Sequence, residues 1–267
     1  MKILWASLSV LLLPQILKAQ TIDEMVMARQ LSTHVMQVRA ATLGSAIALE
    51  DHLAVTNCHV LGNATTVYVT RGSLGSRATL KAGDTGHDLC LLELEDSPSF
   101  PVKVERAASL ALGAKVYAVG FGAGRLSFGI GVITGLHPYD GGLIVRSDAP
   151  FAEGASGGGL FNNEGNLVGV LTFFRRGVQG SSYWAMPSDW IQPLKDLQSQ
   201  TVDRSRLPIW SKQRSISVHF LQVAGCEIDG DWDQMRAHAQ EWLSEEPDSE
   251  EAMRALQFAN SKLRQVH

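Results

Sequence analysis

The stretch Gly-Ala-Ser-Gly-Gly at residues 154–158 sets one serine among small residues, and two earlier stretches are comparably distinctive. Thr-Asn-Cys-His-Val at 56–60 follows an apolar run, and Asp-Leu-Cys-Leu-Leu at 88–92 opens one. In chain order they supply a histidine, an aspartate and a serine: His59, Asp88 and Ser156. That order and those settings predict a nucleophilic triad whose three side chains meet in the folded protein.

The sequence around these stretches, from about residue 31 to residue 187, is patterned as short strands. About twelve segments of roughly 4–8 residues are rich in Val, Leu, Ile, Thr or aromatic residues, with Gly, Asn and Asp between them. Close-set strands of this kind indicate barrels or a sandwich. The Asp-Ser-Pro-Ser-Phe-Pro segment at 96–101 divides them into two halves, so we predict an all-β domain over 20–199.

The first 19 residues have the pattern of a cleavable export signal. Lys2 precedes an apolar run, and Ala19 offers a small residue before the expected cut. The run is about 15 residues long and contains Pro14, so it is short for a retained membrane anchor, the alternative. We therefore expect a periplasmic or secreted protein that has no membrane association after signal cleavage.

The C-terminal part of the chain differs in composition from the rest. Residues 20–219 carry 17 basic and 17 acidic side chains, whereas residues 220–267 carry 4 and 10. Nothing is basic enough to suggest a nucleic-acid partner. We predict a linker at 200–219 and an acidic helical hairpin at 220–267, in which two apolar stripes have helical spacing. The stripes are expected to pack on each other and on the β domain; the alternative is a binding site for a protein partner. The oligomeric state is left open.

Three cysteines allow at most one intramolecular disulfide. Buried free thiols are the first expectation for Cys58 and Cys90, and a bridge between them is the alternative. Cys226 is expected to be unpaired. A zinc site at Cys58, His59 and Cys90 is not expected, because the paired spacing of zinc ligands is absent. We predict no metal.

Each of the three candidate side chains would have a defined chemical task. A serine hydroxyl is a poor nucleophile and needs an adjacent base, which His59 would supply to Ser156. Asp88 would hold the imidazole in one tautomer. Gly154 would let its own backbone N–H and that of Ser156 point into one oxyanion hole.

Other residues could take these places. His87 is next to Asp88 and is the closest rival of His59, while Asp84 is the alternative carboxylate. Asp88 could instead form an ordinary salt bridge with an arginine, and Ser156 could occupy an ordinary glycine turn.

These stretches resemble the chymotrypsin-fold serine proteases and, among them, the high-temperature-requirement (HtrA/Deg-type) branch. The similarity covers about residues 31–195; Gly-Ser-Ala-Ile-Ala-Leu at 44–49 and Gly-Ile-Gly-Val-Ile-Thr-Gly at 129–135 also resemble strands of that branch. The resemblance implies two perpendicular six-stranded antiparallel β-barrels, to which this chain adds a small C-terminal α-helical appendage. It also implies hydrolysis of polypeptide substrates through an acyl-enzyme, with no cofactor.

Two departures from the pattern limit what the resemblance implies. Ala155 stands where digestive-type zymogens need Asp, so activation by N-terminal cleavage is not expected. The residues after about 195 are too few and too helical for the PDZ domain typical of the HtrA branch. Regulation by such a domain is therefore not expected.

The resemblance also suggests a specificity pocket. The residues that would form its base and walls are Pro150, Leu171, Thr172, Phe173 and Ala185. No carboxylate is obvious among them, so cleavage after small or medium apolar residues is expected. Asp148 is expected to brace the nucleophile loop.

The leading hypothesis is an exported serine endopeptidase. The alternative is a catalytically silent protease-fold binding module that acts through the cleft or the acidic helical tail. An esterase-like hydrolase of the α/β type is disfavoured, because the chain lacks alternating strands and helices.

Overall fold

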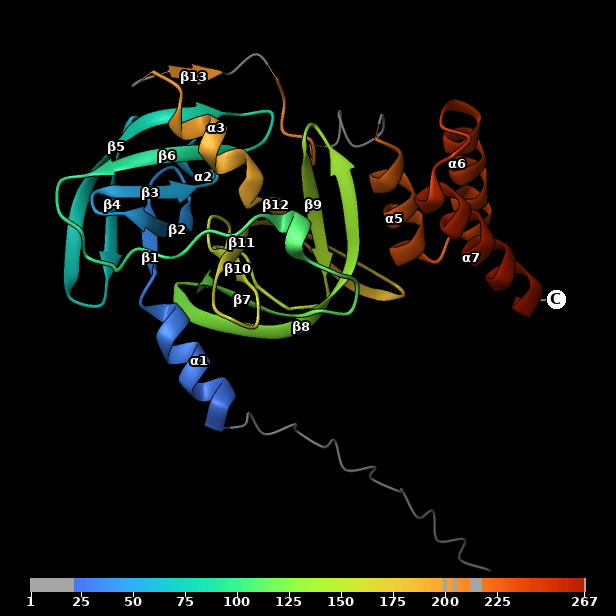
Figure 1. The fold of residues 1–267 in the computed structure, drawn as a ribbon, viewed down its shortest axis with the longest axis horizontal. Helices are drawn as coiled ribbons and strands as arrows, with labels where there is room; N and C mark the ends of the chain where they lie inside the picture. The colour runs from blue at the N-terminus through green and yellow to red at the C-terminus, as the bar shows by residue number, and fades with distance from the viewer. Residues whose placement is uncertain (1–21, 199–200, 204–205, 212–217, 267) are drawn as a thin grey trace, which may run out of the picture.

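The computed structural model describes residues 22–198, 201–203, 206–211 and 218–266. Two closed β-barrels lie side by side, and three C-terminal helices lie against the second barrel (Figure 1). The predicted architecture of two six-stranded antiparallel barrels with a helical appendage is confirmed. The predicted export signal at 1–19 lies outside the described residues.

The first barrel has the strand order β5-β4-β1-β2-β3-β6 and closes through pairing of β5 with β6. Its strands are β1 (Val35–Arg39), β2 (Leu43–Glu50), β3 (Leu53–Thr56), β4 (Thr66–Arg71), β5 (Leu74–Asp84) and β6 (Leu89–Leu94). The alternation of apolar and polar residues gives the strands an inward and an outward side. In β4, Val67 and Val69 are buried inside while Thr66 and Tyr68 face out, as the two-residue period of a strand requires.

The second barrel has the order β10-β11-β12-β9-β8-β7 and is also closed. Its strands are β7 (Lys115–Gly122), β8 (Arg125–Tyr139), β9 (Gly142–Ser147), β10 (Gly159–Phe161), β11 (Leu167–Gly177) and β12 (Gly180–Pro187). A β-bulge interrupts the pairing of β11 with β12 between Leu171 and Phe173. Because a bulge changes which side chains face inward, it affects the cleft described below.

One continuous apolar cluster joins the two barrels and the helices. It includes Ile47 and Leu91 of the first barrel, Trp184 of the second and Phe220 of the C-terminal helices. Two smaller clusters fill the barrel interiors. A shared core of this kind fixes the barrels relative to each other, and therefore fixes the walls of the cleft between them.

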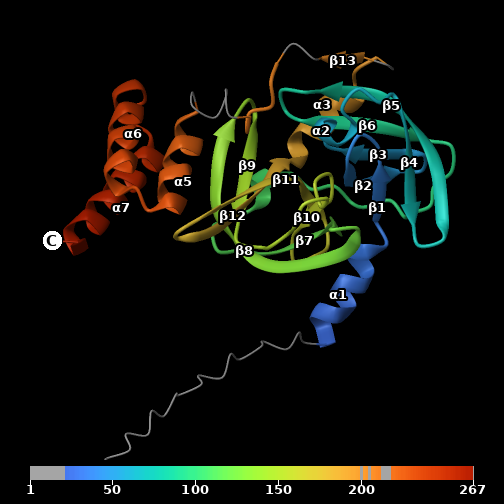
Figure 2. The ribbon, with the colours of Figure 1, turned by 180° about the vertical axis from the view of Figure 1, so that it is seen from behind.

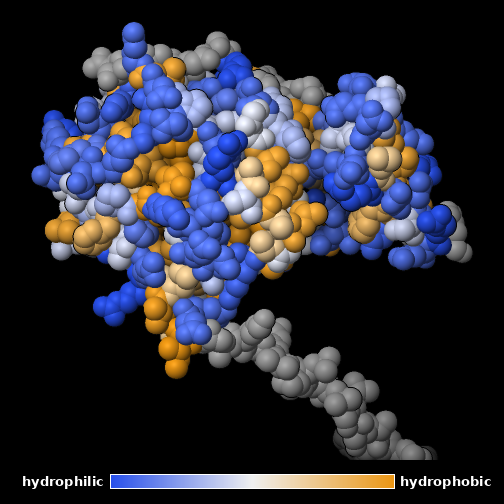
Figure 3. Space-filling view, in the orientation of Figure 1, coloured by the Kyte–Doolittle hydropathy of each residue, from blue (hydrophilic) through white to orange (hydrophobic). Residues whose placement is uncertain are grey.

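Short helices connect or flank the barrels. They are α1 (Ile22–Ser32), α2 (Cys58–Leu61), η1 (Ala107–Ser109), η2 (Ser188–Trp190) and α3 (Ile191–Lys195). Leu31 is the buried residue of α1. At the N-terminal end of this helix, Ile22, Met25 and Val26 form an exposed apolar surface (Figure 3). None of the described helices is long and apolar enough to cross a membrane.

The C-terminal region holds three helices and not the expected pair: α5 (His219–Asp229), α6 (Trp232–Glu245) and α7 (Glu250–Val266). Both views place α5 against the second barrel (Figures 1 and 2). Phe220, Leu221 and Val223 of α5 are buried, so the apolar side chains at its start pack on the barrel. Gly230 ends α5 in the left-handed conformation, with its N–H bonded to the carbonyls of Cys226 and Glu227. The packing of its apolar side chains on the β domain accounts for this third helix.

The described part of the expected linker at 200–219 also has more regular structure than the sequence predicted. Residues Thr201–Asp203 form β13, which pairs in parallel with the edge of β5. Ile209 is buried in the shared core. The segment 206–211 thus lies on the protein surface as part of the fold, while the division of the chain into domains stays a prediction.

Candidate active site

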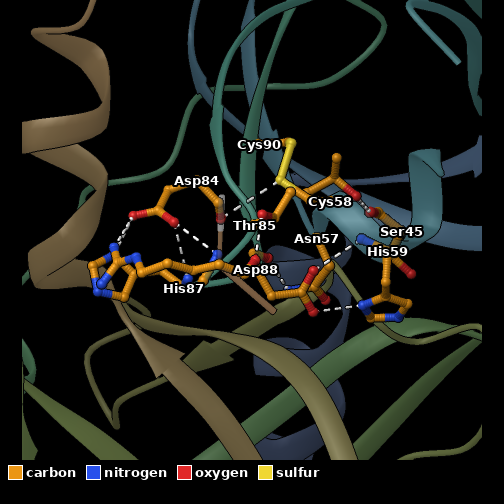
Figure 4. The surroundings of a disulfide bond; sticks show 12 residues. Ser45, Asn57, Cys58, His59, Asp84, Thr85, His87, Asp88 and Cys90 are labelled. Atoms are coloured by element: carbon orange, nitrogen blue, oxygen red, sulfur yellow. Dashed lines mark hydrogen bonds and ion pairs between the residues drawn. A yellow bond between two sulfur atoms is a disulfide. The ribbon is translucent and has the colours of Figure 1, made fainter. Parts of the chain in front are cut away.

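His59 and Asp88 meet at the end of the first barrel. His59 lies in α2, the single turn that follows β3, and Asp88 immediately precedes β6. The Nδ1 atom of His59 is 2.6 Å from Oδ2 of Asp88, and the backbone N–H of His59 donates to Oδ1 at 2.9 Å (Figure 4). Asp88 is fully buried, so these bonds offset the cost of removing its charge from water.

The backbone at Asp88 is held in an unusual conformation. Its φ of 57° is in the left-handed region, which aspartate tolerates better than most residues. The carbonyl of Asp88 accepts from Asn57 Nδ2 at 2.9 Å and from the backbone N–H of Cys58 at 3.3 Å. The stretch before His59 therefore also fixes the aspartate.

A disulfide joins Cys58 to Cys90, so the expectation of two free thiols is wrong. The reason lies in the strand register. β3 and β6 are antiparallel neighbours, and Thr56 is paired with Cys90. This pairing brings the two Cα atoms to 5.0 Å, within the range of a disulfide. Cys226 is free, as expected.

Ser156 lies in the loop between β9 and β10, where glycines allow close backbone approach. Gly157 has a φ of 84°, and a Cβ there would lie 2.0 Å from the carbonyl oxygen of Ser45. The backbone N–H of Ser45 in turn donates to the carbonyl of Ser156 at 2.8 Å. The first barrel thus holds the loop of the second in place.

Ser156 and His59 line one open cleft of about 960 Å³. The Ser156 hydroxyl donates to the carbonyl of Thr172 at 2.9 Å. Among the residues that the structure describes, no hydrogen bond joins this hydroxyl to His59. The structure therefore places His59 and Ser156 in one cleft, with Asp88 buried behind His59 and the serine hydroxyl directed at β11.

The backbone around Ser156 leaves two donors unused. Gly154 has a φ of 89°, and both Gly154 and Ser156 line the cleft. No hydrogen bond within the described part of the chain uses the backbone N–H of either residue. Gly154 and Ser156 therefore stay the candidates for the predicted oxyanion hole.

The five residues suggested for a specificity pocket lie in three different places. Thr172 and Phe173 line the cleft. Leu171 and Ala185 are instead 1% and 2% exposed, in the core of the second barrel. Pro150 is exposed and lies outside the cleft-lining set. The bulge in β11 lies where Thr172, Phe173 and Phe174 in succession line the cleft after the inward-facing Leu171.

Aromatic side chains fill the region beside the nucleophile loop. Phe151 is 6% exposed and packs with Tyr183 at 5.2 Å and with Phe174 at 5.8 Å between ring centroids. The charged residues that line the cleft, besides the candidate histidine, are Glu153 and Arg176. The guanidinium of Arg176 lies 4.7 Å from the ring of Phe174.

Sequence reasoning missed Trp210. Its indole Nε1 donates to Oδ2 of Asp88 at 2.9 Å, and its ring meets the ring of His59 edge-on at 5.2 Å. The signal that could have found it is the apolar run Leu-Pro-Ile-Trp at 207–210 within a mostly polar linker, which indicates packing on the protein body.

The rivals His87 and Asp84 belong to a separate cluster outside the cleft lining. His87 stacks on Trp190 with ring centroids at 3.9 Å, and its ring nitrogens contact Asp84 at 3.0 Å and Asp140 at 2.8 Å. Burial raises the pKa of Asp84, but the hydrogen bond and charge of His87 and the charge of Arg206 outweigh burial. The net pKa of Asp84 is well below its ordinary value. Among the described residues, no group of three or more His, Cys, Asp or Glu could hold a metal ion.

Comparisons with known proteins agree with this geometry. The family model of the trypsin-like peptidase domain matches residues 44–170. Serine protease HTRA4 of Mus musculus is 32% identical over 178 residues, which cover 62% of this chain and 36% of that protein. Periplasmic serine endoprotease DegP of Escherichia coli (strain K12) is 28% identical over 181 residues, covering 62% and 37%. The solved HtrA-type protease AlgW with tripeptide shares the fold at a TM-score of 0.58 and 22% identity, covering 64% of this chain and 62% of that chain.

The chain spans little more than a third of the length of these curated relatives. Within that span, residues 44–170 resemble the trypsin-like peptidase domain, and the similar proteins include serine proteases of the HtrA and DegP type.

Proposed function

We propose that this chain, which carries a trypsin-like serine protease domain, is an exported serine endopeptidase that uses His59, Asp88 and Ser156. The observation that supports this most strongly is the His59–Asp88 contact of 2.6 Å in a cleft that Ser156 also lines. Polypeptide substrates follow from the protease relatives.

In the proposed reaction, the Ser156 hydroxyl turns from the carbonyl of Thr172 toward Nε2 of His59 and attacks a substrate carbonyl. His59 takes the hydroxyl proton and passes it to the leaving amine, while Asp88 stabilises the imidazolium. The resulting acyl-enzyme is hydrolysed by water with His59 again acting as base. The N–H groups of Gly154 and Ser156 would stabilise the oxyanion, each by about 2.7–4 kcal/mol.

The test is labelling with a fluorophosphonate serine probe together with digestion of an unfolded protein. We expect labelling at Ser156 only. The Ser156→Ala variant should lose turnover by about 10⁶-fold, and His59→Ala by a similar factor. Ser181→Ala is the matched control, because Ser181 is exposed on β12 and lies outside the cleft-lining residues.

Resistance of the folded wild-type protein to both the probe and the unfolded substrate would overturn the proposal. A protease-fold binding module, acting through the cleft or the acidic helices, would then be the better description. Turnover that survives Ser156→Ala would show that another group carries the chemistry.

We propose that the enzyme cleaves after small or medium apolar residues. The packing of Phe151 on Phe174 and Tyr183 supports this, because these rings occupy space beside the nucleophile loop. Thr172 and Phe173 on β11 would contact the substrate, whose backbone would add to that strand. Cleavage-site mapping in an unfolded protein tests this, and a preference for Lys or Arg before the cut would refute it.

Export to the periplasm or beyond is part of the proposal. It is supported by the leader pattern at 1–19, by the disulfide and by the periplasmic relative DegP. Mass spectrometry of the mature protein should find Gln20 as the first residue, and a cytosolic protein that retains residue 1 would contradict this.

A further inference from the structure

The segment 206–211, which we call the strap, brings a side chain to the candidate triad from outside the matched peptidase domain. Nε1 of Trp210 is 2.9 Å from Oδ2 of Asp88, the same oxygen that His59 Nδ1 contacts at 2.6 Å. Oδ1 of Asp88 accepts a hydrogen bond from the backbone N–H of His59. Both carboxylate oxygens therefore have donors, and the indole supplies one of the three.

The strap is docked on the loop that carries the aspartate. Nη2 of Arg206 is 2.7 Å from Oδ2 of Asp84, and the carbonyl of Arg206 accepts from Thr85 Oγ1 at 2.7 Å. The backbone N–H of Ile209 donates to the carbonyl of Gly86 at 3.2 Å. A Cβ at Gly86 would lie 2.8 Å from Nε of Arg206, so this glycine allows the close approach.

The apolar contacts of the strap point the indole at the cleft. Ile209 is 1% exposed in the shared core, which anchors the residue before Trp210. The indole ring lies 6.1 Å from the ring of Phe173 and 5.2 Å from the ring of His59. Trp210 is only half-buried and lines the cleft itself. One face of the strap therefore packs in the shared core, and the other face forms part of the cleft wall.

A hydrogen bond from a neutral donor to a buried carboxylate fixes the direction of that carboxylate. Here the indole N–H holds Oδ2 where it can accept a hydrogen bond from His59 Nδ1. That bond keeps the imidazole in the orientation that a general base needs. A phenylalanine would fill the same space without donating a hydrogen bond. The donor therefore points to a role beyond packing.

We propose that Trp210 is a positioning residue for the candidate triad, and that the strap completes the active site of the protease domain. This rests on the proposed function. Trp210 acts through Asp88 and His59 and does not itself take part in bond making or breaking. Accordingly, the chain beyond the matched domain is required for full turnover.

The test compares Trp210→Phe with Trp232→Phe in the full-length protein. Trp232 is a half-buried tryptophan of α6 that lies outside the cleft-lining residues, and it is the matched control. We expect Trp210→Phe to lower kcat by about 10- to 100-fold, the rate equivalent of one hydrogen bond to a charged group. KM should change by less than about threefold, because the ring that lines the cleft is largely preserved.

A second measurement does not depend on turnover. The proton between His59 Nδ1 and Asp88 should give a downfield proton NMR signal in the wild-type protein. Trp210→Phe should shift or broaden that signal, whereas Trp232→Phe should leave it in place. A variant that only loosened packing would lower Tm without a selective change in this signal.

The two proposals fail in different ways. If Trp210→Phe keeps the wild-type kcat and the wild-type NMR signal, the positioning role is refuted while the protease assignment stands. If the wild-type protein neither reacts with a fluorophosphonate nor cleaves an unfolded protein, the protease assignment fails, and the NMR comparison still decides whether Trp210 orients the pair. If Trp210→Phe does not fold, Arg206→Gln gives the answer: loosening the strap should lower kcat, and an unchanged kcat would refute its role.

Discussion

At the scale of single residues, the candidate site depends on which carboxylate meets His59. The sequence offered Asp88 and Asp84 within the same loop, and the structure pairs Asp88 with His59 and Asp84 with His87 and Arg206. The residues alone favoured Asp88 because an apolar strand follows it. The contact with Trp210 could not be predicted, because it joins positions 122 residues apart.

We predict that Asp88→Asn lowers kcat by about 10⁴-fold while the protein stays folded, because an amide would favour the wrong imidazole tautomer. Asp51→Asn is the control and should change kcat by less than about threefold, since Asp51 is exposed on the turn between β2 and β3 and lies outside the cleft-lining residues. Steady-state kinetics with an unfolded substrate would show this, and equal losses in the two variants would contradict the assignment.

The pKa of Asp84 predicts how stability depends on pH. Its pKa is depressed in the folded protein, so its ionised form stabilises the fold above the unfolded-state pKa of about 3.9. That stability should be lost as pH falls below about 4. Urea unfolding at a series of pH values should show a shallower acid loss for Asp84→Asn than for the wild-type protein. Parallel curves would mean that the contacts of His87 and Arg206 do not favour the ionised carboxylate.

At the scale of elements, pairing between strands decides what the local sequence leaves open. The bridge between Cys58 and Cys90 follows from the register of β3 against β6, in which Thr56 faces Cys90. Each strand could be predicted from its own residues, but the register is a property of two strands. The same limit applies to β11, where a bulge sends Thr172 and Phe173 to the cleft and leaves Leu171 inside.

We predict that replacing Cys58 and Cys90 together by alanine lowers the free energy of unfolding by about 2–4 kcal/mol, because the bridge closes a long loop in the unfolded chain. Their separation in sequence is 32 residues. Cys226→Ala is the control and should have a much smaller effect, since Cys226 is a free thiol. Denaturant unfolding measures both variants, and equal stabilities would show that the bridge contributes little.

At the scale of the whole molecule, the C-terminal helices share a core with the β domain. Phe220 of α5 lies 4.6 Å from the ring of His137 and 6.1 Å from the ring of Trp184. Arg146 on β9 forms an ion pair with Glu227 at 2.6 Å. The acidic composition set this region apart in the sequence, but its attachment to the second barrel could be seen only in the fold.

We predict that Phe220→Ala lowers the free energy of unfolding by about 3–5 kcal/mol and leaves kcat of the folded protein within about threefold of wild type. Phe220 is 5% exposed, whereas Phe258 of α7 is 40% exposed, so Phe258→Ala is the matched control with a smaller effect. Thermal and urea unfolding would compare them. A large loss of kcat in Phe220→Ala alone would mean that the helices also influence the cleft.

The strand pattern was enough to predict an all-β domain, and the resemblance to the chymotrypsin-fold proteases predicted two barrels, because alternating apolar residues and glycine-flanked polar residues are local signals. The same local signals named the candidate triad residues, which stay a prediction. The disulfide, the cleft walls and the position of Trp210 beside Asp88 emerged only from the folded chain. Each of these depends on contacts between segments that are distant along the chain, and such contacts form only when the apolar surfaces of both barrels and the strap are buried together.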